Sequence, residues 1–119
     1  MPGITTVGMN NALSQLDGTL YLSAHNGPPA GGTTNEATTR QAVTFGAAYD
    51  TLTGRARANS GEVLFTDPGA GTYEAWSEWT AATVGDCLWV VPYDINRTLL
   101  AGDDLRASPG AVECIIEPG

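Results

Sequence analysis

Lysine is absent from this 119-residue sequence, and all five of its basic residues are arginines. Thirteen acidic residues outnumber them, so the formal net charge is −8. Charged residues make up only 15% of the chain, where about a quarter is usual for globular domains. Affinity for nucleic acids and for anionic membranes depends on clustered basic side chains. The composition therefore predicts a partner that is neither a nucleic acid nor a membrane.

Long apolar runs are absent as well. No stretch approaches the roughly 18 residues of a membrane-spanning helix. The start, Met1-Pro2-Gly3, lacks the basic and apolar regions of a secretory signal. We therefore expect synthesis in a cytoplasm and no export by a standard signal. In that compartment Cys87 and Cys114 are predicted to be reduced, as small buried side chains without a bridge.

Residues that carry catalysis or bind metals are few. His25 is the only histidine and no G-x-S-x-G motif accompanies it, so we expect it to make a local hydrogen bond. One histidine and two distant cysteines do not form a zinc site, which needs clustered ligands. Asp103 and Asp104 carry oxygens of the kind that calcium takes, although no calcium-loop motif is present. We predict no catalytic residue, no metal and no cofactor, with calcium binding as the alternative.

The first 18 residues are predicted to form an N-terminal arm and a short helix. Three apolar residues follow the spacing of one helix face: Met9, Leu13 and Leu16. Asn10 or Asn11 is a candidate cap for the start of this helix, and Gly18 is a candidate for its end. Because two turns of helix are marginally stable alone, we expect the helix to pack on the rest of the chain.

Residues 19–119 are predicted to form one all-β domain, in which alternating segments are separated by turn residues. The predicted strands are 20–25, 42–49, 57–65, 72–80, 87–93, 97–100 and 111–117. The segment 87–93 is apolar on both faces and is expected at the centre of a sheet, ending or bending at Pro92. Strands at this spacing favour a single β-sandwich of about six to eight short strands, immunoglobulin-like or jelly-roll-like, over a small barrel.

The segment 72–80 carries the residues most suited to binding. Glu74, Trp76 and Glu78 share one strand face, opposite a face that includes Tyr73 and Trp79. Acids on such a face are usually just solvated, and strand tryptophans usually pack in the core. We name Glu74, Trp76 and Glu78 as candidates for contact with a carbohydrate or a protein partner. Glycoside hydrolysis, which places two carboxylates across a sugar, is a further alternative.

The order of these segments is similar to that of a known family. A strand ends in His25 and enters a loop rich in glycine and proline, which leads to Asn35-Glu36 and then to Arg40 before the next strand. The later pieces that fit are Asn59 before Val63 and Phe65, Thr72 to Trp79, Gly85 to Trp89, Ala101 to Leu105, and Pro109 to Val112. Over roughly residues 9 to 117, this order resembles small structural proteins of tailed phages, described as tail-fibre-like, minor tail or head-decoration proteins.

The resemblance implies a β-sandwich that belongs to the virion, is made in the host cytoplasm and has no enzymatic activity. We predict a capsid decoration protein that binds the capsid lattice, copies of itself, or both. The major capsid protein and a tail protein are the other expected partners. The chain is expected to be one compact domain without coiled-coil heptads or a collagen-like repeat. This favours a position on the capsid over a role in a fibre shaft. The alternative is a minor tail or tail-fibre protein, with or without carbohydrate binding at the host surface.

Overall fold

Alternating apolar and polar residues place two strands at the centre of the largest sheet. These are β1 (Leu20–His25) and β6 (Gly71–Trp79), in a computed structural model that describes residues 4–116. They are flanked by β2 (Gln41–Val43) and β7 (Cys87–Leu99), and the antiparallel sheet has the order β2-β1-β6-β7. Side chains of β6 are buried on both faces of the sheet, as its inner position requires.

A second layer covers one face of this sheet. It is the antiparallel pair of β5 (Val63–Phe65) and β8 (Leu105–Ala107). Phe65 stacks on Trp76 with ring centroids 5.7 Å apart, and Trp76 also contacts Tyr93 at 4.6 Å. These rings and the buried leucines and valines around them form the core between the layers. The predicted all-β sandwich with a short N-terminal helix is confirmed, and its sheets do not close into a barrel within residues 4–116.

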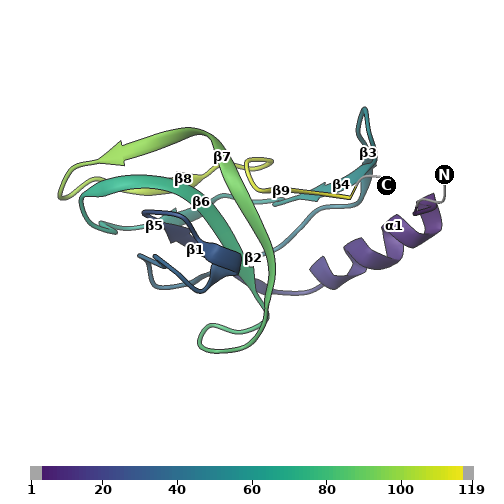
Figure 1. Ribbon diagram of the computed structural model, residues 1–119, viewed down its shortest axis with the longest axis horizontal. Helices are drawn as coiled ribbons and strands as arrows, with labels where there is room; N and C mark the ends of the chain where they lie inside the picture. The colour runs from purple at the N-terminus through teal and green to yellow at the C-terminus, as the bar shows by residue number, and fades with distance from the viewer. Residues whose placement is uncertain (1–3, 117–119) are drawn as a thin grey trace.

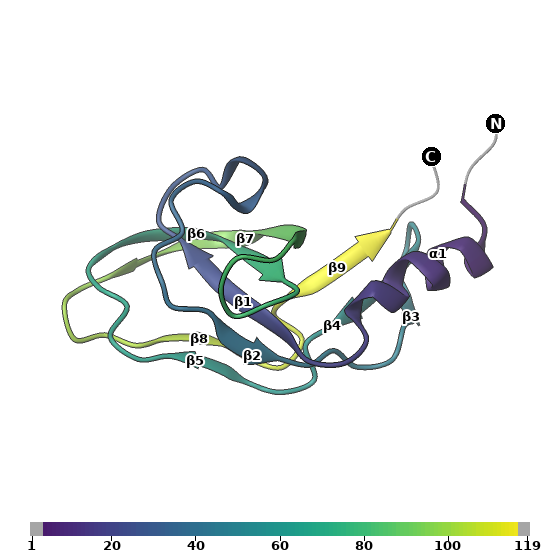
Figure 2. The same cartoon turned by 90° about the horizontal axis from the view of Figure 1, so that it is seen from below.

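A third, smaller sheet projects from the sandwich and is covered by the helix. It has the order β3-β4-β9, formed by Tyr49–Asp50, Arg55–Ala58 and Glu113–Ile116. Helix α1 (Thr6–Leu13) packs on β4 and β9 and continues into the 3-10 turn η1 (Ser14–Leu16). Figures 1 and 2 show these elements at one end of a molecule that measures 48 × 25 × 24 Å. We call α1, β3, β4 and β9 the extension, and the remaining elements the body.

The helix begins earlier than predicted. Thr5, not Asn10 or Asn11, caps it, and the Thr5 hydroxyl accepts a hydrogen bond at 3.1 Å from the N–H three residues later. Gly18 adopts a left-handed conformation, with φ of +76°, where the chain turns toward β1. Of the arm predicted before the helix, residues 1–3 lie outside the described part of the chain. The predicted apolar face is confirmed, because its three members are buried: Met9, Leu13 and Leu16.

The strands predicted at 87–93 and 97–100 belong to one strand, β7. Pro92 does not end it, because β7 lies at the edge of the sheet and Pro92 sits opposite Ala75, next to an irregularity in the ladder. The expectation that 87–93 is a central strand is therefore wrong. Its apolar residues pack against the core from the edge, and the 3-10 turn η2 (Ala30–Gly32) contacts the strand.

A buried asparagine interrupts a predicted strand. The segment 57–65 divides into β4 and β5 at Asn59, and the segment 42–49 divides into β2 and β3. The Asn59 amide nitrogen donates to the backbone carbonyls of Gly61 and Ser108 at 2.8 and 3.0 Å, and Oδ1 accepts from the N–H of Val112 at 2.9 Å. These partners lie on the segments that lead from the body into the extension, so Asn59 holds the junction between the two parts.

Candidate functional site

The three predicted contact residues of β6 do not form an exposed face. Trp76 and Glu78 are 4% and 0% exposed, and Glu74 is half-buried. The β5–β8 layer covers Trp76 through Phe65, and β9 covers Glu78 through Cys114. The expectation that the acids of this face are solvated is therefore wrong for Glu78, whereas the expectation that a strand tryptophan packs in the core is confirmed for Trp76. Of the three residues, only Glu74 retains surface for a partner.

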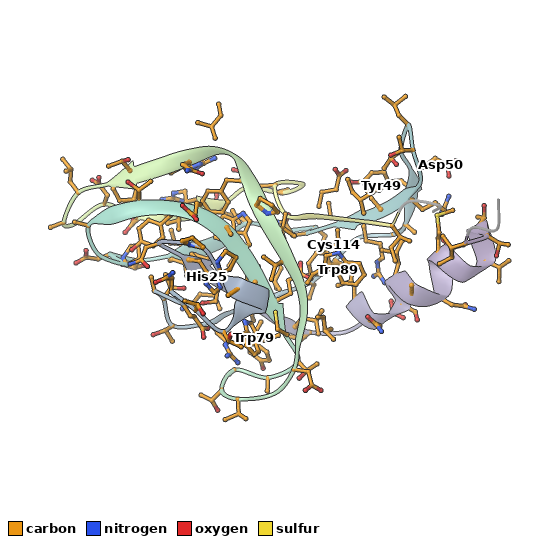
Figure 3. All side chains as sticks on the ribbon, viewed as in Figure 1. His25, Tyr49, Asp50, Trp79, Trp89 and Cys114 are labelled. Carbon is orange, nitrogen blue, oxygen red and sulfur yellow. The ribbon has the colours of Figure 1, made fainter. Side chains whose placement is uncertain are left out.

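Glu78 places a carboxyl group inside the protein. Its Oε1 accepts a hydrogen bond from Cys114 Sγ at 3.1 Å, while Oε2 has no hydrogen-bond partner in the part of the chain that the structure describes. Burial disfavours the charged form and raises the pKa of Glu78 to about 7. Burial and the nearby Glu78 carboxyl also raise the pKa of the Cys114 thiol. The pair connects β6 with β9, and Figure 3 shows Cys114 between the body and the extension.

His25 is fully buried and takes part in a chain of hydrogen bonds. Its Nδ1 lies 2.8 Å from the carbonyl oxygen of Thr34, which can only accept, so Nδ1 carries the proton. In the neutral ring Nε2 then accepts from the Ser77 hydroxyl at 2.7 Å, and Ser77 Oγ accepts from Trp79 Nε1 at 2.8 Å. The Ser77–His25 contact has the distance of a catalytic pair, but both side chains are 0% exposed and no substrate reaches them. The expected local hydrogen bond of His25 is confirmed.

The loop after His25 is also attached to the body through Arg40. This side chain pairs with Glu36 at 2.8 Å and lies 3.7 Å from the centre of the Trp79 ring. Gly32 allows the loop to approach β7, since its φ is +93° and a Cβ atom there would lie 2.5 Å from Cys87 Sγ. These polar contacts position a loop, and they form no open site.

The acids that suggested calcium serve two turns at the far end of the body. Asp103 Oδ2 accepts from the N–H of Leu100 at 2.9 Å, and Asp104 Oδ1 accepts from the N–H of Asp67 at 3.0 Å. Within residues 4–116, no three potential metal ligands come together. Both cysteines are free thiols, although Cys87 is only half-buried.

An open groove of about 790 Å³ runs between β7 and the chain that joins β8 to β9. Its charged members are Arg97, Arg106 and Glu113. The groove contains no histidine and no cysteine. Its large apolar members are Trp76, Val91, Pro92, Tyr93, Ile95 and Ile115.

Sequence reasoning missed this groove, although one of its members carried a signal. Ile95, 80% exposed, lines the groove and falls between two predicted strands. Leu52, which is fully exposed and lies outside the groove, also falls between two predicted strands. A large apolar side chain in such a segment has no core to fill, which makes it a candidate contact with another molecule.

Most of the positive charge is neutralised within the chain. The described residues form four ion pairs: Arg40–Glu36, Arg55–Asp50, Arg57–Asp17 and Arg106–Glu62, with distances of 2.5 to 2.8 Å. These contacts leave little free cationic surface for phosphate groups. No helix in residues 4–116 has the length and apolar character to cross a membrane.

The structure is that of a small all-β protein with buried polar clusters and an open groove. Residues 8–114 match the model of a family described as Podophage GP4 fiber I protein gp80. Because the match spans most of the chain, the protein belongs to this family of phage fibre proteins, and its role is that of a structural component of the virion. The resemblance to structural proteins of tailed phages is thereby confirmed. A comparison with curated proteins finds no match.

Proposed function

We propose that this chain is a fibre protein of a tailed-phage particle and acts by binding other protein chains. The family match over residues 8–114 carries the proposal. The structure supports it with a sandwich whose arginines are largely paired internally and with a groove that combines apolar and charged side chains. Copies of this chain and another virion protein are the partners that we infer.

Decoration of the capsid is the alternative position, and the family description favours a fibre over it. Copy number in purified particles separates the two. A decoration protein covers a repetitive lattice and should be present on the order of hundreds of copies, whereas a fibre at the tail should be present in far fewer. Quantitative mass spectrometry provides the number, and antibody labelling in electron micrographs provides the position. A count in the hundreds with label over the whole head would contradict the fibre proposal.

Carbohydrate contact through the predicted residues now depends on Glu74, because Trp76 and Glu78 are buried. Glycan-array binding that is lost in a Glu74→Ala variant would support such contact. The matched control is Glu62→Ala, which changes an acid that is also on the surface and is paired with Arg106.

A further inference from the structure

Glu78 lies on the inner face of the main sheet, β2-β1-β6-β7, at the point where the extension meets the body. Its register partners are Leu22 on β1 and Trp89 on β7, and directly opposed residues of neighbouring strands share one face. The carboxyl group is therefore flanked by two apolar side chains, and Glu78 is 0% exposed. Cys114 of β9 closes this position from the side of the extension. Figure 3 shows Trp89 and Cys114 at this place.

The buried carboxyl group has fewer hydrogen bonds than its two oxygens can accept. Oε1 accepts from the Cys114 thiol, which is a weak donor, and Oε2 has no partner within residues 4–116. A protonated carboxyl group in this position leaves one polar oxygen unpaired, whereas an ionised one would place a full charge there. Because an unpaired buried charge costs far more than an unpaired polar group, the closed arrangement favours the protonated form.

The neighbouring ionisable groups do not offset a negative charge on Glu78. At adjacent strand positions these are Tyr21 and His25 on β1, Cys87 on β7, Arg57 on β4, and Glu113 and Cys114 on β9. The two groups on β1 lie on the opposite face of the sheet, where His25 bonds to Ser77. Arg57 already pairs with Asp17 and donates to two carbonyl groups. Helix α1 carries no ionisable side chain, so an ionised Glu78 would be uncompensated.

The same contact joins the two parts of the molecule. In the described part of the chain, the Cys114–Glu78 bond is the only hydrogen bond between a strand of the extension and a strand of the main sheet. The strand β9 has its own partner in the extension, because residues 113–116 pair with β4. Separation of β9 from β6 therefore breaks one weak bond and leaves both sheets intact.

We propose that Glu78 is a proton-dependent latch between the body and the extension. The protonated carboxyl group holds β9 against β6. When it releases its proton to water, the contact opens, so that the carboxylate becomes hydrated and Cys114 becomes accessible while both sheets stay folded. Burial raises the pKa of Glu78 to about 7, so the latch works near neutral pH. The inference goes beyond the proposed function and does not depend on it, because it concerns the two parts of one chain.

The first test measures how often Cys114 becomes accessible. In a Cys87→Ser chain Cys114 is the only thiol, and its rate of reaction with a pyridyl disulfide is followed against pH. Division by the rate in the urea-unfolded chain at the same pH removes the titration of the thiol itself and gives the open fraction. The open fraction should rise about 40-fold between about pH 5 and pH 7 and then level off, because the released carboxyl group regains its ordinary pKa of 4.5.

Variants of the Cys87→Ser chain identify the titrating group. Glu78→Gln should keep the open fraction constant over the same pH range. Glu78→Met, which replaces the carboxyl group by an apolar end of similar length, should do the same and provides the comparison if the Gln chain does not fold. Glu62→Gln is the matched control, because Glu62 is a surface acid of the body that pairs with Arg106, and this variant should keep the full rise.

A second measurement separates opening of the latch from unfolding of the whole chain. The effect of urea on an equilibrium scales with the surface that becomes exposed, and the latch exposes little. At a pH above 7, roughly 1 M urea should change the normalised reaction rate of Cys114 by less than about twofold, whereas the unfolded fraction should rise about tenfold or more.

An open fraction that does not change with pH would overturn the latch, and so would an equal rise in the Gln or Met variant. A reaction rate of Cys114 that increases with urea as steeply as the unfolded fraction would show that only global unfolding exposes the thiol, which would overturn the local opening.

Discussion

The body and the extension are stabilised in different ways. In the body, aromatic rings and leucines fill the space between two layers, and Trp76 contacts both Phe65 and Tyr93. In the extension, the central strand β4 reads Arg-Ala-Arg-Ala, so one face offers guanidinium groups and the other offers methyl groups. Burial of large apolar side chains stabilises more than partly exposed ion pairs do. The body therefore folds mainly through apolar burial, whereas the extension combines the buried apolar face of its helix with polar contacts and with its attachment to the body.

The polar contacts of Arg57 are directed mainly at backbone atoms. Arg57 donates to the carbonyls of Gly46 at 2.8 Å and Leu13 at 3.1 Å, and it pairs with Asp17. One arginine thus ties the helix, β4 and the chain before β3 together. Such contacts fix geometry more than they add stability.

The largest loss of unfolding free energy is expected for Trp76→Ala, a variant in the body. This variant removes a buried ring that contacts Phe65 and Tyr93, and the expected loss of unfolding free energy is about 3 to 5 kcal/mol. Ile115→Ala in the extension is the control, with an expected loss of about 1 kcal/mol because Ile115 is half-buried. Urea unfolding followed by circular dichroism gives both values. Equal losses of unfolding free energy in the two variants would contradict the conclusion that apolar burial stabilises the body more than the extension.

Asn59→Ala acts at the junction. It removes the donor to Gly61 and Ser108 and leaves the N–H of Val112 buried without a partner, so the expected loss is about 3 kcal/mol. Asn59→Asp should be destabilised as well, because a carboxylate accepts from Val112 but cannot donate to two carbonyls. All three tryptophans lie in the body, so their fluorescence reports on the body alone. Full stability of the Asp variant would mean that the donated bonds have little effect.

Glu78→Gln tests the pH dependence of the same junction. The pKa of Glu78 is about 7 in the folded chain against an ordinary value of 4.5, so the folded chain holds this proton more tightly than the unfolded chain. The protonated Glu78 carboxyl group contributes its full stabilisation below pH 4.5. This contribution falls as the pH rises toward 7 and is lost above pH 7. Its total is at most about 3 kcal/mol. The unfolding free energy of the Gln variant should not show this decrease with pH.

A second carboxyl group with a shifted pKa also contributes to the pH dependence and must be subtracted. Glu36 contributes with the opposite sign, because its partial burial is outweighed by Arg40, which lowers its pKa. The informative measurement is therefore the difference between the wild-type and Glu78→Gln profiles of unfolding free energy against pH. A constant difference between pH 4 and 8 would mean that Glu78 does not titrate in this window.

The smallest effect is expected for Tyr49→Phe in the extension. The Tyr49 hydroxyl donates to Glu113 at the surface, and its removal should cost ~0.5 kcal/mol because water replaces it. Thermal unfolding measured by calorimetry should show a shift of a few degrees at most. A larger shift would indicate that the extension depends on this bond more than on its attachment to the body.

Strands with strict alternation could be predicted from the sequence, and those interrupted by distant contacts could not. Leu20–His25 and Gly71–Trp79 follow from their own residues. The break at Asn59 depends on carbonyl and amide groups about 50 positions away along the chain, which no local pattern contains. The continuation of β7 through Pro92 depends on its position at the sheet edge, which is a property of the assembled sheet.

The candidate site was less predictable than the fold for a related reason. Charged residues are ordinarily exposed, so the pattern assigned Glu78 to a solvated face, yet its neighbours enclose it. The groove forms where β7 passes the chain between β8 and β9, so its members become neighbours only after folding.

The loop from Asn26 to Glu36 has little regular structure, and its contacts determine how it can move. To leave the sheet, it must break the Thr34–His25 hydrogen bond and separate Gly32 from Cys87 and Trp79. A free surface loop rearranges within nanoseconds to microseconds, whereas a segment held by buried contacts moves only when that region opens as a unit. On the timescale of ordinary loop motion, this irregular segment therefore behaves as a rigid part of the sandwich.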